Sequence, residues 1–253
     1  WLVDHKIINK FSLNYFFLKF FEMLLYLQAD NIYVQTKKDI KYLIKYKKIL
    51  NFNDAVIYNW IDTKSLTDKK NNKKKRKYVR FIFLGVIGVA QDHKLLNRMI
   101  QFCNEQKFQA SFFFIGSGTE KEKLINLTNR YNNVFFYSEM NIHKIDKFIK
   151  KCDVCISTLS KNFYSENFPG KILRYMVNNK PMLVHSPNNF FLKSLIENHS
   201  LGLFSSDEDQ FFKNISLIFS DFSSFQKKGK NGLSVAKNNF SCEKAKKILF
   251  PEI

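Results

Sequence analysis

From residue 79 onward, short apolar segments alternate with longer segments of helical periodicity. The apolar segments are rich in Phe, Ile and Val and are not interrupted by alternating polar residues, which is typical of parallel strands buried on both faces. We predict six strands, each followed by a helix, at "VRFIFLG", "ASFFFIG", "NVFFY", "DVCIST", "PMLVHS" and "LGLFS". Six consecutive strand–helix units predict an α/β fold with a doubly wound parallel sheet and right-handed crossovers.

The first 62 residues show a shorter version of this pattern. A helix is predicted at about 12–28, a strand at "NIYVQT", a second helix at "KKDIKYLIKYKKIL" and a second strand at "AVIYN". Residues 63–78 carry Lys, Asn, Ser and Thr and very few apolar side chains, so we predict a Lys-rich linker there. The chain therefore divides into 1–62, the linker 63–78, a complete α/β domain at 79–240 and a C-terminal helix at 241–253.

The run Tyr15–Leu27 is the most apolar of the chain, but it is too short and too charged to span a bilayer. As a helix it fits a protein core, which is the default expectation, or a membrane interface. The chain begins with Trp rather than Met, and we expect an upstream portion to precede it.

The composition is globular and strongly basic. Of 253 residues, 45% are hydrophobic and 28 are Phe, while 41 Lys and Arg against 22 Asp and Glu give a net charge of +19. Such an excess favours anionic partners: nucleic acid, acidic lipid or a phosphorylated substrate. Its densest part, "KKNNKKKRK", fits a solvated linker, and since no nucleic-acid-binding module accompanies it we expect no nucleic acid partner. Four Cys without a disulfide framework indicate a reducing compartment.

Doubly wound sheets bind ligands outside the carboxyl ends of their strands, near helix N-termini. Two predicted strands end there in glycine-bearing turns, with Gly85 and Gly88 in "FLGVIGVAQ" and Gly116 and Gly118 in "FFIGSGTEKEKL". Such glycines let backbone N–H groups face a phosphate. Each turn also fits an ordinary tight connection between a strand and a helix.

A third candidate is the stretch "ENFPGKILRYMVNNKP". Pro169 and Gly170 begin a predicted helix, Lys171 lies in its first turn, and Glu166 lies in the preceding loop. The free N–H groups and the positive end of a helix dipole suit a diphosphate, whose charge the Lys would neutralise. Glu166 is an acceptor suited to sugar hydroxyls. The alternative is a surface helix with a solvated Lys.

Seven segments of the chain, in their order along it, resemble retaining glycosyltransferases of family four, which have the GT-B fold. They are "ADNIYVQTKKDIKYL", "VIYNWID", "LGVIGVAQDHKLL", "FIGSGTEKEKL", "NVFFYSEM", "CDVCISTL" and "FPGKILRYMVNNKPML". The last is similar to the form found in enzymes that build bacterial surface polysaccharides. The resemblance implies that residues 79–240 are the nucleotide-sugar (donor) domain. It also implies that residues 1–62 are the C-terminal remnant of a second Rossmann-like domain, which binds the acceptor.

The resemblance further implies roles for single residues. Lys171 and Glu166 would be catalytic, Lys171 stabilising the leaving nucleoside diphosphate and Glu166 contacting the transferred sugar. The substrate-binding residues would be Gly85, Gly88, Gln91, Gly116, Gly118, Tyr137, Met140, Pro169, Gly170 and Tyr175. Residues 137–140 would lie against the base. No metal and no cofactor are expected besides the donor, a UDP-sugar, since the helix dipole and the Lys supply the electrostatic stabilisation.

Two departures from the family pattern stand out. Many members carry a second Glu eight residues after the first, on the ribose hydroxyls, whereas this chain has Arg174, which cannot accept a hydrogen bond. Many also have a basic pair after the first glycine turn. Here that region reads "VAQDHK", where Gln91 would fill the gap and His93 fits an ordinary helix-start residue.

We therefore expect a glycosyltransferase of hexosyl or N-acetylhexosaminyl type, or its donor-binding part. It would transfer sugar with retention to a lipid-linked or polysaccharide acceptor in the synthesis of surface polysaccharide, such as lipopolysaccharide or capsule. The expected location is the cytoplasm, at the inner face of the cytoplasmic membrane and in peripheral contact with anionic lipid. The alternatives are a non-catalytic remnant acting as a binding or assembly module and, third, a nucleic-acid-binding protein.

Overall fold

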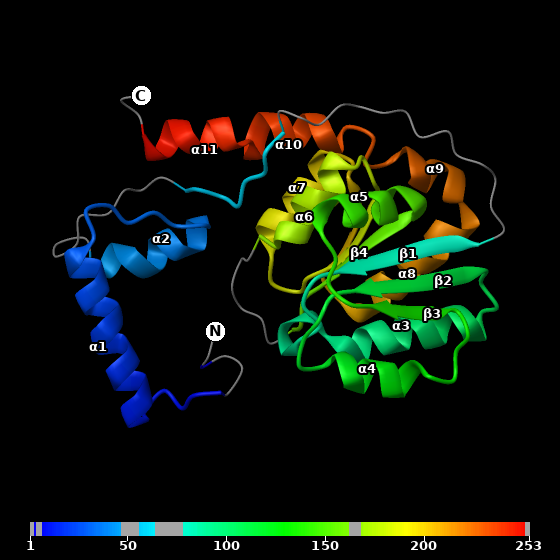
Figure 1. The fold of residues 1–253 in the computed structure, drawn as a ribbon, viewed down its shortest axis with the longest axis horizontal. Helices are drawn as coiled ribbons and strands as arrows, with labels where there is room; N and C mark the ends of the chain where they lie inside the picture. Colours follow the sequence, from blue (N-terminus) through cyan, green and yellow to red (C-terminus); the bar gives the residue numbers. More distant parts are fainter. Residues whose placement is uncertain (1–2, 4–6, 47–55, 64–77, 162–167, 251–253) are drawn as a thin grey trace.

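The computed structural model describes residues 3, 7–46, 56–63, 78–161 and 168–250 (Figure 1). At its centre lies one parallel sheet with the strand order β3-β2-β1-β4-β5-β6. The strands are β1 (Val79–Leu84), β2 (Ala110–Ile115), β3 (Val134–Tyr137), β4 (Val154–Thr158), β5 (Met182–His185) and β6 (Gly202–Ser205). All six predicted strands are present, which confirms the α/β fold with a doubly wound parallel sheet. The order places the topological switch point between β1 and β4, where such sheets bind ligands.

Helices cover both faces of this sheet (Figure 1). One face packs against α3 (His93–Glu105), α4 (Lys121–Thr128), α8 (Glu208–Ser220) and α9 (Phe222–Lys227). The other packs against α5 (Ile142–Lys151), α6 (Gly170–Val177), α7 (Phe190–Asn198) and α10 (Gly232–Phe240), and α11 (Cys242–Leu249) follows α10. Short connections between buried strands and these helices bring the helix N-termini to the carboxyl edge of the sheet.

The high Phe content builds the core between the sheet and α3. On β1, Phe81 and Phe83 face this side, and Ile82 faces the α6 side. Phe81 stacks on Phe112 of β2 with ring centroids 5.2 Å apart. In the register of β1 and β2, Phe81 pairs with Phe112 and Phe83 pairs with Phe114. The Phe-rich apolar runs of neighbouring strands therefore pack ring against ring.

The N-terminal part contains two helices but no extended strand among its described residues. Helix α1 (Leu13–Gln28) has Ser12 as its N-cap, and α2 (Lys37–Leu43) starts with a capping box formed by Thr36 and Asp39, followed by the 3-10 turn η1 (Ile44–Tyr46). The strands predicted at 31–36 and 55–59 are wrong as extended elements, since the structure has only an isolated parallel bridge between Val34 and Val56. A parallel strand needs neighbours to form a ladder, and the described residues provide a single pairing position. The predicted linker falls almost entirely on residues 64–77, outside the described residues.

Helix α1 is not a core helix in this chain. None of its 16 residues, all of which the structure describes, is buried. Phe17 and Leu25 are 63% and 67% exposed, and the pair Lys19 and Glu22 lies toward Tyr42 of α2. The default expectation of a core helix is therefore wrong for the residues described. None of the described helices is both long and apolar enough to cross a membrane.

Residues 56–61 are attached to the larger domain. Ile61 donates its N–H to the carbonyl of Phe240 (2.9 Å), and the side-chain amide of Asn59 donates to the carbonyl of Phe168 (2.6 Å). The ring of Tyr58 stacks on Phe191 at 4.4 Å. These contacts fix the chain just before α6, because Phe168 precedes the first residue of that helix by only two positions.

Candidate functional site

The glycine turns after β1 and β2 pack directly against each other. The N–H of Ile87 donates to the carbonyl of Ser117 (2.7 Å). A Cβ on Gly116 would lie 2.1 Å from the carbonyl oxygen of Gly85, and one on Gly118 would lie 2.4 Å from that of Ile87. Both glycines also have positive φ, +145° and +139°. The close approach of the two loop backbones therefore requires glycine at both positions, whatever ligand the loops hold.

The turn after β1 is shaped by Gln91. Gln91 is one of the predicted substrate-binding residues. In the structure its side-chain oxygen accepts a hydrogen bond from the N–H of Gly88 (3.1 Å), and this bond closes the turn. The carbonyl of Gln91 accepts from the hydroxyl of Thr158 at the end of β4. Gly85 has a φ of +91°, and a Cβ there would meet Cε of Lys171 at 3.9 Å. The turn thus joins the ends of β1 and β4 to the start of α6.

Helix α6 begins at Gly170, and its N-cap residue Pro169 makes no side-chain capping hydrogen bond. Its first-turn N–H groups therefore lack a capping side chain. In this turn, Nζ of Lys171 lies 3.6 Å from the centroid of the Phe83 ring. This ammonium nitrogen is buried, and it has no hydrogen-bond partner among the residues that the structure describes. The desolvation of the buried amine lowers the pKa of Lys171 to about 7.

A buried cation without a counter-ion is costly unless a ligand supplies the charge. The cation–π contact with Phe83 offsets part of that cost. The mouth of α6 combines this amine, a helix N-terminus and the Gly85 turn, so its chemistry fits an anion with several oxygens. Among the described residues, no group of three or more His, Cys, Asp or Glu is arranged to hold a metal ion.

Tyr175 is buried in the core of the domain. Its side chain is completely buried, its hydroxyl oxygen accepts from the N–H of Leu84 (3.0 Å), and its hydroxyl donates to the carbonyl of Ile156 (3.1 Å). These bonds tie α6 to the end of β1 and to the middle of β4. In this structure Tyr175 packs in the core, and its predicted substrate contact stays a prediction. The sequence carries a signal for this burial, because helical spacing places Tyr175 among the apolar positions of α6.

The predicted base-side residues follow β3. Tyr137 ends that strand and Met140 follows, and both are half-buried against the core. Lys121, which the sequence did not single out, donates to the carbonyls of Gly116 (2.8 Å) and Tyr137 (3.1 Å). It thereby fixes the ends of β2 and β3. A lysine in the first turn of a helix gives no sequence signal for that role.

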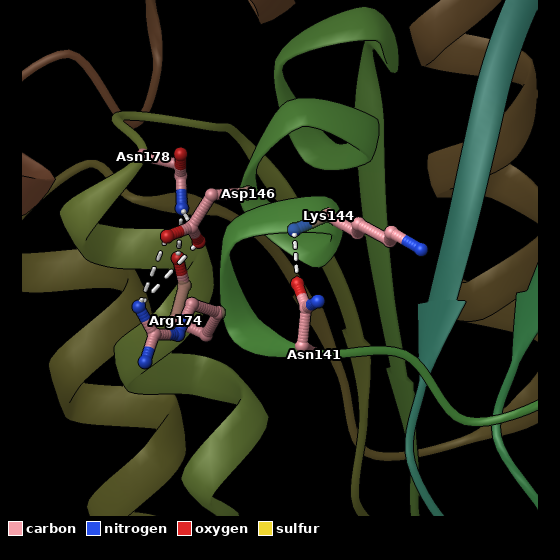
Figure 2. Close-up of polar contacts among 5 residues, drawn as sticks. All are labelled: Asn141, Lys144, Asp146, Arg174 and Asn178. Carbon is pink, nitrogen blue, oxygen red and sulfur yellow. Dashed lines mark hydrogen bonds and ion pairs between the residues drawn. The ribbon is translucent and has the colours of Figure 1, made fainter.

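Two further polar contacts were not predictable from the chain alone. His93, the first residue of α3, lies with Nδ1 3.4 Å from a carboxylate oxygen of the buried Glu120, which also pairs with Lys123 (2.9 Å). Arg174 lies with Nη1 3.3 Å from Oδ2 of Asp146 on α5 (Figure 2). Glu166 lies outside the described residues.

An apolar pocket of about 290 Å³ lies elsewhere, between residues 56–60 and helices α7 and α11. Its lining includes Tyr58, Phe191 and Phe240. Neither Lys171 nor any of the loop glycines lines it.

This architecture is that of the GT-B glycosyltransferases. HepE from Anabaena, in complex with UDP and glucose, has a TM-score of 0.70 at 14% identity, covering 92% of this chain and 65% of that one. TarM from S. aureus, as a variant in complex with fondaparinux, alpha-GlcNAc-glycerol and UDP, has a TM-score of 0.68 at 13% identity, covering 91% of this chain and 45% of that one. Sucrose-phosphate synthase from Thermosynechococcus elongatus has a TM-score of 0.69 at 16% identity, covering 90% and 58%.

The sequence match shows the family of this chain. Residues 64–235, more than half of the chain, match the family described as Glycosyl transferases group 1, and the chain belongs to this family. No curated protein matches the sequence significantly. The chain spans about half to two thirds of the length of the solved structures that it resembles.

Proposed function

We propose that this chain is the donor-binding part of a retaining glycosyltransferase that uses a nucleoside-diphosphate sugar, with UDP as the nucleotide. The observation that carries the proposal is the buried amine of Lys171, which has no hydrogen-bond partner among the described residues and lies in the first turn of α6. A diphosphate bound at this helix mouth would receive N–H groups from α6 and the charge of Lys171. HepE and the TarM variant, which this chain resembles in fold, were solved with UDP, and this supports the choice of nucleotide.

The same arrangement suits the chemistry of sugar transfer. As the bond between the sugar and the diphosphate breaks, negative charge grows on the departing oxygen. A fixed cation and a helix N-terminus stabilise that charge more in the transition state than in the bound donor. In this proposal Lys171 is catalytic, Gly85 and Gly88 present backbone to the diphosphate, and residues 137–140 lie against the base. Glu166 contacts the transferred sugar, a role that rests on the resemblance of its loop.

The acceptor and its location belong to the same proposal. We infer a lipid-linked or polysaccharide acceptor in surface-polysaccharide synthesis, approached at the cytoplasmic face of the membrane. The net charge of +19 and the exposed Phe side chains of α1 support peripheral contact with anionic lipid. Co-sedimentation with phosphatidylcholine vesicles, with and without phosphatidylglycerol, tests this part. Binding that needs the anionic lipid and falls with salt supports it, and equal or absent binding to both vesicles refutes it.

Thermal unfolding with a ligand panel tests the donor site. UDP, UDP-glucose and UDP-N-acetylglucosamine are each compared with buffer for the native chain, for Lys171→Met, and for Lys123→Met as a control. Lys123 lies on α4, is 65% exposed and pairs with Glu120, so Lys123→Met removes a lysine charge from a different helix. The proposal predicts a rise in Tm with UDP that Lys171→Met loses and Lys123→Met keeps. A rise that persists in Lys171→Met contradicts the proposed site, and the absence of any rise contradicts donor binding.

Turnover separates the enzyme from its alternative. Native chain that binds UDP-sugar and releases UDP in the presence of an acceptor is a transferase. Chain that binds UDP but hydrolyses or transfers nothing, with any acceptor offered, is a non-catalytic binding or assembly module.

A further inference from the structure

The backbone just before helix α6 is held by a side chain from a distant part of the sequence. Nδ2 of Asn59 donates to the carbonyl oxygen of Phe168 at 2.6 Å, across 109 residues of the chain. Oδ1 of the same amide accepts from Nε2 of Gln35 at 3.2 Å. A carbonyl only accepts and the NH₂ group of Gln35 only donates, so the two partners fix which way the Asn59 amide points.

The side chain of Phe168 is fixed together with its carbonyl. It is completely buried, and its ring centroid lies 6.1, 5.4 and 4.8 Å from those of Tyr58, Phe191 and Phe240. Tyr58 and Asn59 are neighbours in the chain, so one short segment contacts both the ring and the carbonyl of Phe168. The entry to α6 therefore has an anchor outside the helix.

This anchor matters because α6 lacks the usual one. Several other helices begin with a side chain that accepts a hydrogen bond from a first-turn N–H group: α3 at Asp92, α5 at Asn141, α7 at Asn189 and α8 at Asp207. The N-cap residue of α6 is Pro169, which makes no such bond. A capping side chain uses N–H groups that a ligand would otherwise receive. A bond to the carbonyl of Phe168 holds the start of the helix and uses none of them.

The residue that depends on this anchor is Lys171, three positions after Phe168. Its Nζ lies 3.6 Å from the centroid of the Phe83 ring on β1 and has no hydrogen-bond partner in the part of the chain that the structure describes. The amine and the first-turn N–H groups can contact one ligand only while the start of α6 keeps its place beside β1. Binding sites of this kind need their groups held to within about 0.5 Å.

We propose that Asn59 is a positioning residue of the diphosphate site. Through the carbonyl of Phe168 it holds the start of α6, so that Lys171 and the first-turn N–H groups meet the diphosphate together. The inference rests on the proposed function, which places the diphosphate at Lys171. Asn59 itself touches no ligand in this role. Because its amide also accepts from Gln35, one side chain connects the N-terminal part of the chain with the diphosphate site.

Competition calorimetry with UDP, inorganic pyrophosphate and uridine tests the proposal. The variants are Asn59→Leu, which is similar in size and donates no hydrogen bond, and Asn59→Ser, whose hydroxyl is shorter than the amide. The control is Asn104→Leu. Asn104 lies in the last turn of α3, where its amide donates to the carbonyl of Ile100 (2.8 Å) and accepts from Asn133 (3.3 Å). The control therefore removes the same pair of hydrogen bonds from a different helix.

The expected loss is specific to the phosphates. Both Asn59 variants should bind UDP and pyrophosphate about threefold to tenfold more weakly than the native chain, the range that one lost hydrogen bond allows, and bind uridine as tightly. Asn104→Leu should bind all three ligands like the native chain.

Several results would overturn the proposal. Unchanged affinity for UDP and pyrophosphate in a folded Asn59 variant shows that the anchor does not position the site. An equal loss for uridine, or a similar loss in Asn104→Leu, shows general damage to the fold. If circular dichroism finds neither Asn59 variant folded, Asn59 serves folding rather than positioning. If the native chain binds neither UDP nor pyrophosphate, the proposed function fails and this inference fails with it.

Discussion

The buried amine of Lys171 makes the free protein less stable than it would be with a neutral side chain at this position. The change that exposes this effect is Lys171→Met, which keeps an unbranched side chain over Phe83 and removes the charge. Without ligand, Nζ has no hydrogen-bond partner among the described residues to repay its desolvation. We therefore expect Lys171→Met to raise the free energy of unfolding near neutral pH, in line with the stability–activity trade-off of destabilised active sites.

The size of the effect follows from the pKa. Burial lowers the pKa of Lys171 from 10.5 to about 7. At about 1.4 kcal/mol per unit, this disfavours the protonated form in the folded state by roughly 5 kcal/mol, an upper value for the gain from removing the charge. Between pH 7 and 10.5 the unfolded chain binds the extra proton, so the free energy of unfolding rises with pH in this window. Below pH 7 the penalty is complete and constant, and above 10.5 it has vanished.

Urea unfolding of both chains at pH 6.5, 8 and 9.5 measures the difference directly. Lys171→Met should be more stable by several kcal/mol at pH 6.5, and this advantage should shrink by about 1.4 kcal/mol per pH unit above 7. Comparison of the two chains cancels the contribution of all other titrating groups. A variant that is less stable than the native chain at every pH, or a difference that does not change with pH, refutes the reasoning.

Two substitutions test the packing that positions the site. Tyr175→Phe leaves the N–H of Leu84 and the carbonyl of Ile156 without their buried partner, so the free energy of unfolding should fall by about 1–3 kcal/mol in urea titration. The UDP affinity of the remaining folded protein should stay unchanged, and a large loss of UDP affinity would contradict a role in packing alone. Gly116→Ala brings a Cβ to 2.1 Å from the carbonyl oxygen of Gly85 and requires alanine to adopt a positive φ. We therefore expect poor folding and a Tm lowered by several degrees. A Tm equal to that of the native chain would contradict the loop packing.

The sheet was predictable because its signal is local. In β1 (Val79–Leu84), residues 81–84 are buried and point to both faces of the sheet, so the apolar run can be recognised without knowledge of the neighbouring strands. The predictions at 31–36 and 55–59 relied on the same kind of run, but a run becomes a strand only where other strands extend the ladder. For Val34 and Val56 the described residues form one bridge and no more.

The candidate site was predictable in position rather than in contacts. The rule that ligands bind at the carboxyl edge located Gly85 and Lys171 at the same place, and in the structure a Cβ added to Gly85 would lie 3.9 Å from Cε of Lys171. The partner of Arg174 is Asp146, 28 residues earlier in the chain and on a different helix. Only the packing of α5 against α6 brings these two together, and helix periodicity within one element does not reveal it. The burial of the Lys171 amine likewise depends on the loop after β1 and on Phe83.

The central claim is that Lys171 receives the diphosphate, and proton uptake tests it most directly. Titration calorimetry of UDP at pH 8, in two buffers with different ionisation enthalpies, gives the number of protons taken up on binding. Because the amine has a pKa of about 7 in the free protein, it is mostly neutral at pH 8 and must become protonated beside a diphosphate. The account predicts uptake of close to one proton by the native chain and none by Lys171→Met, which binds UDP more weakly. Binding of UDP without proton uptake, or with the same uptake in both chains, would contradict it.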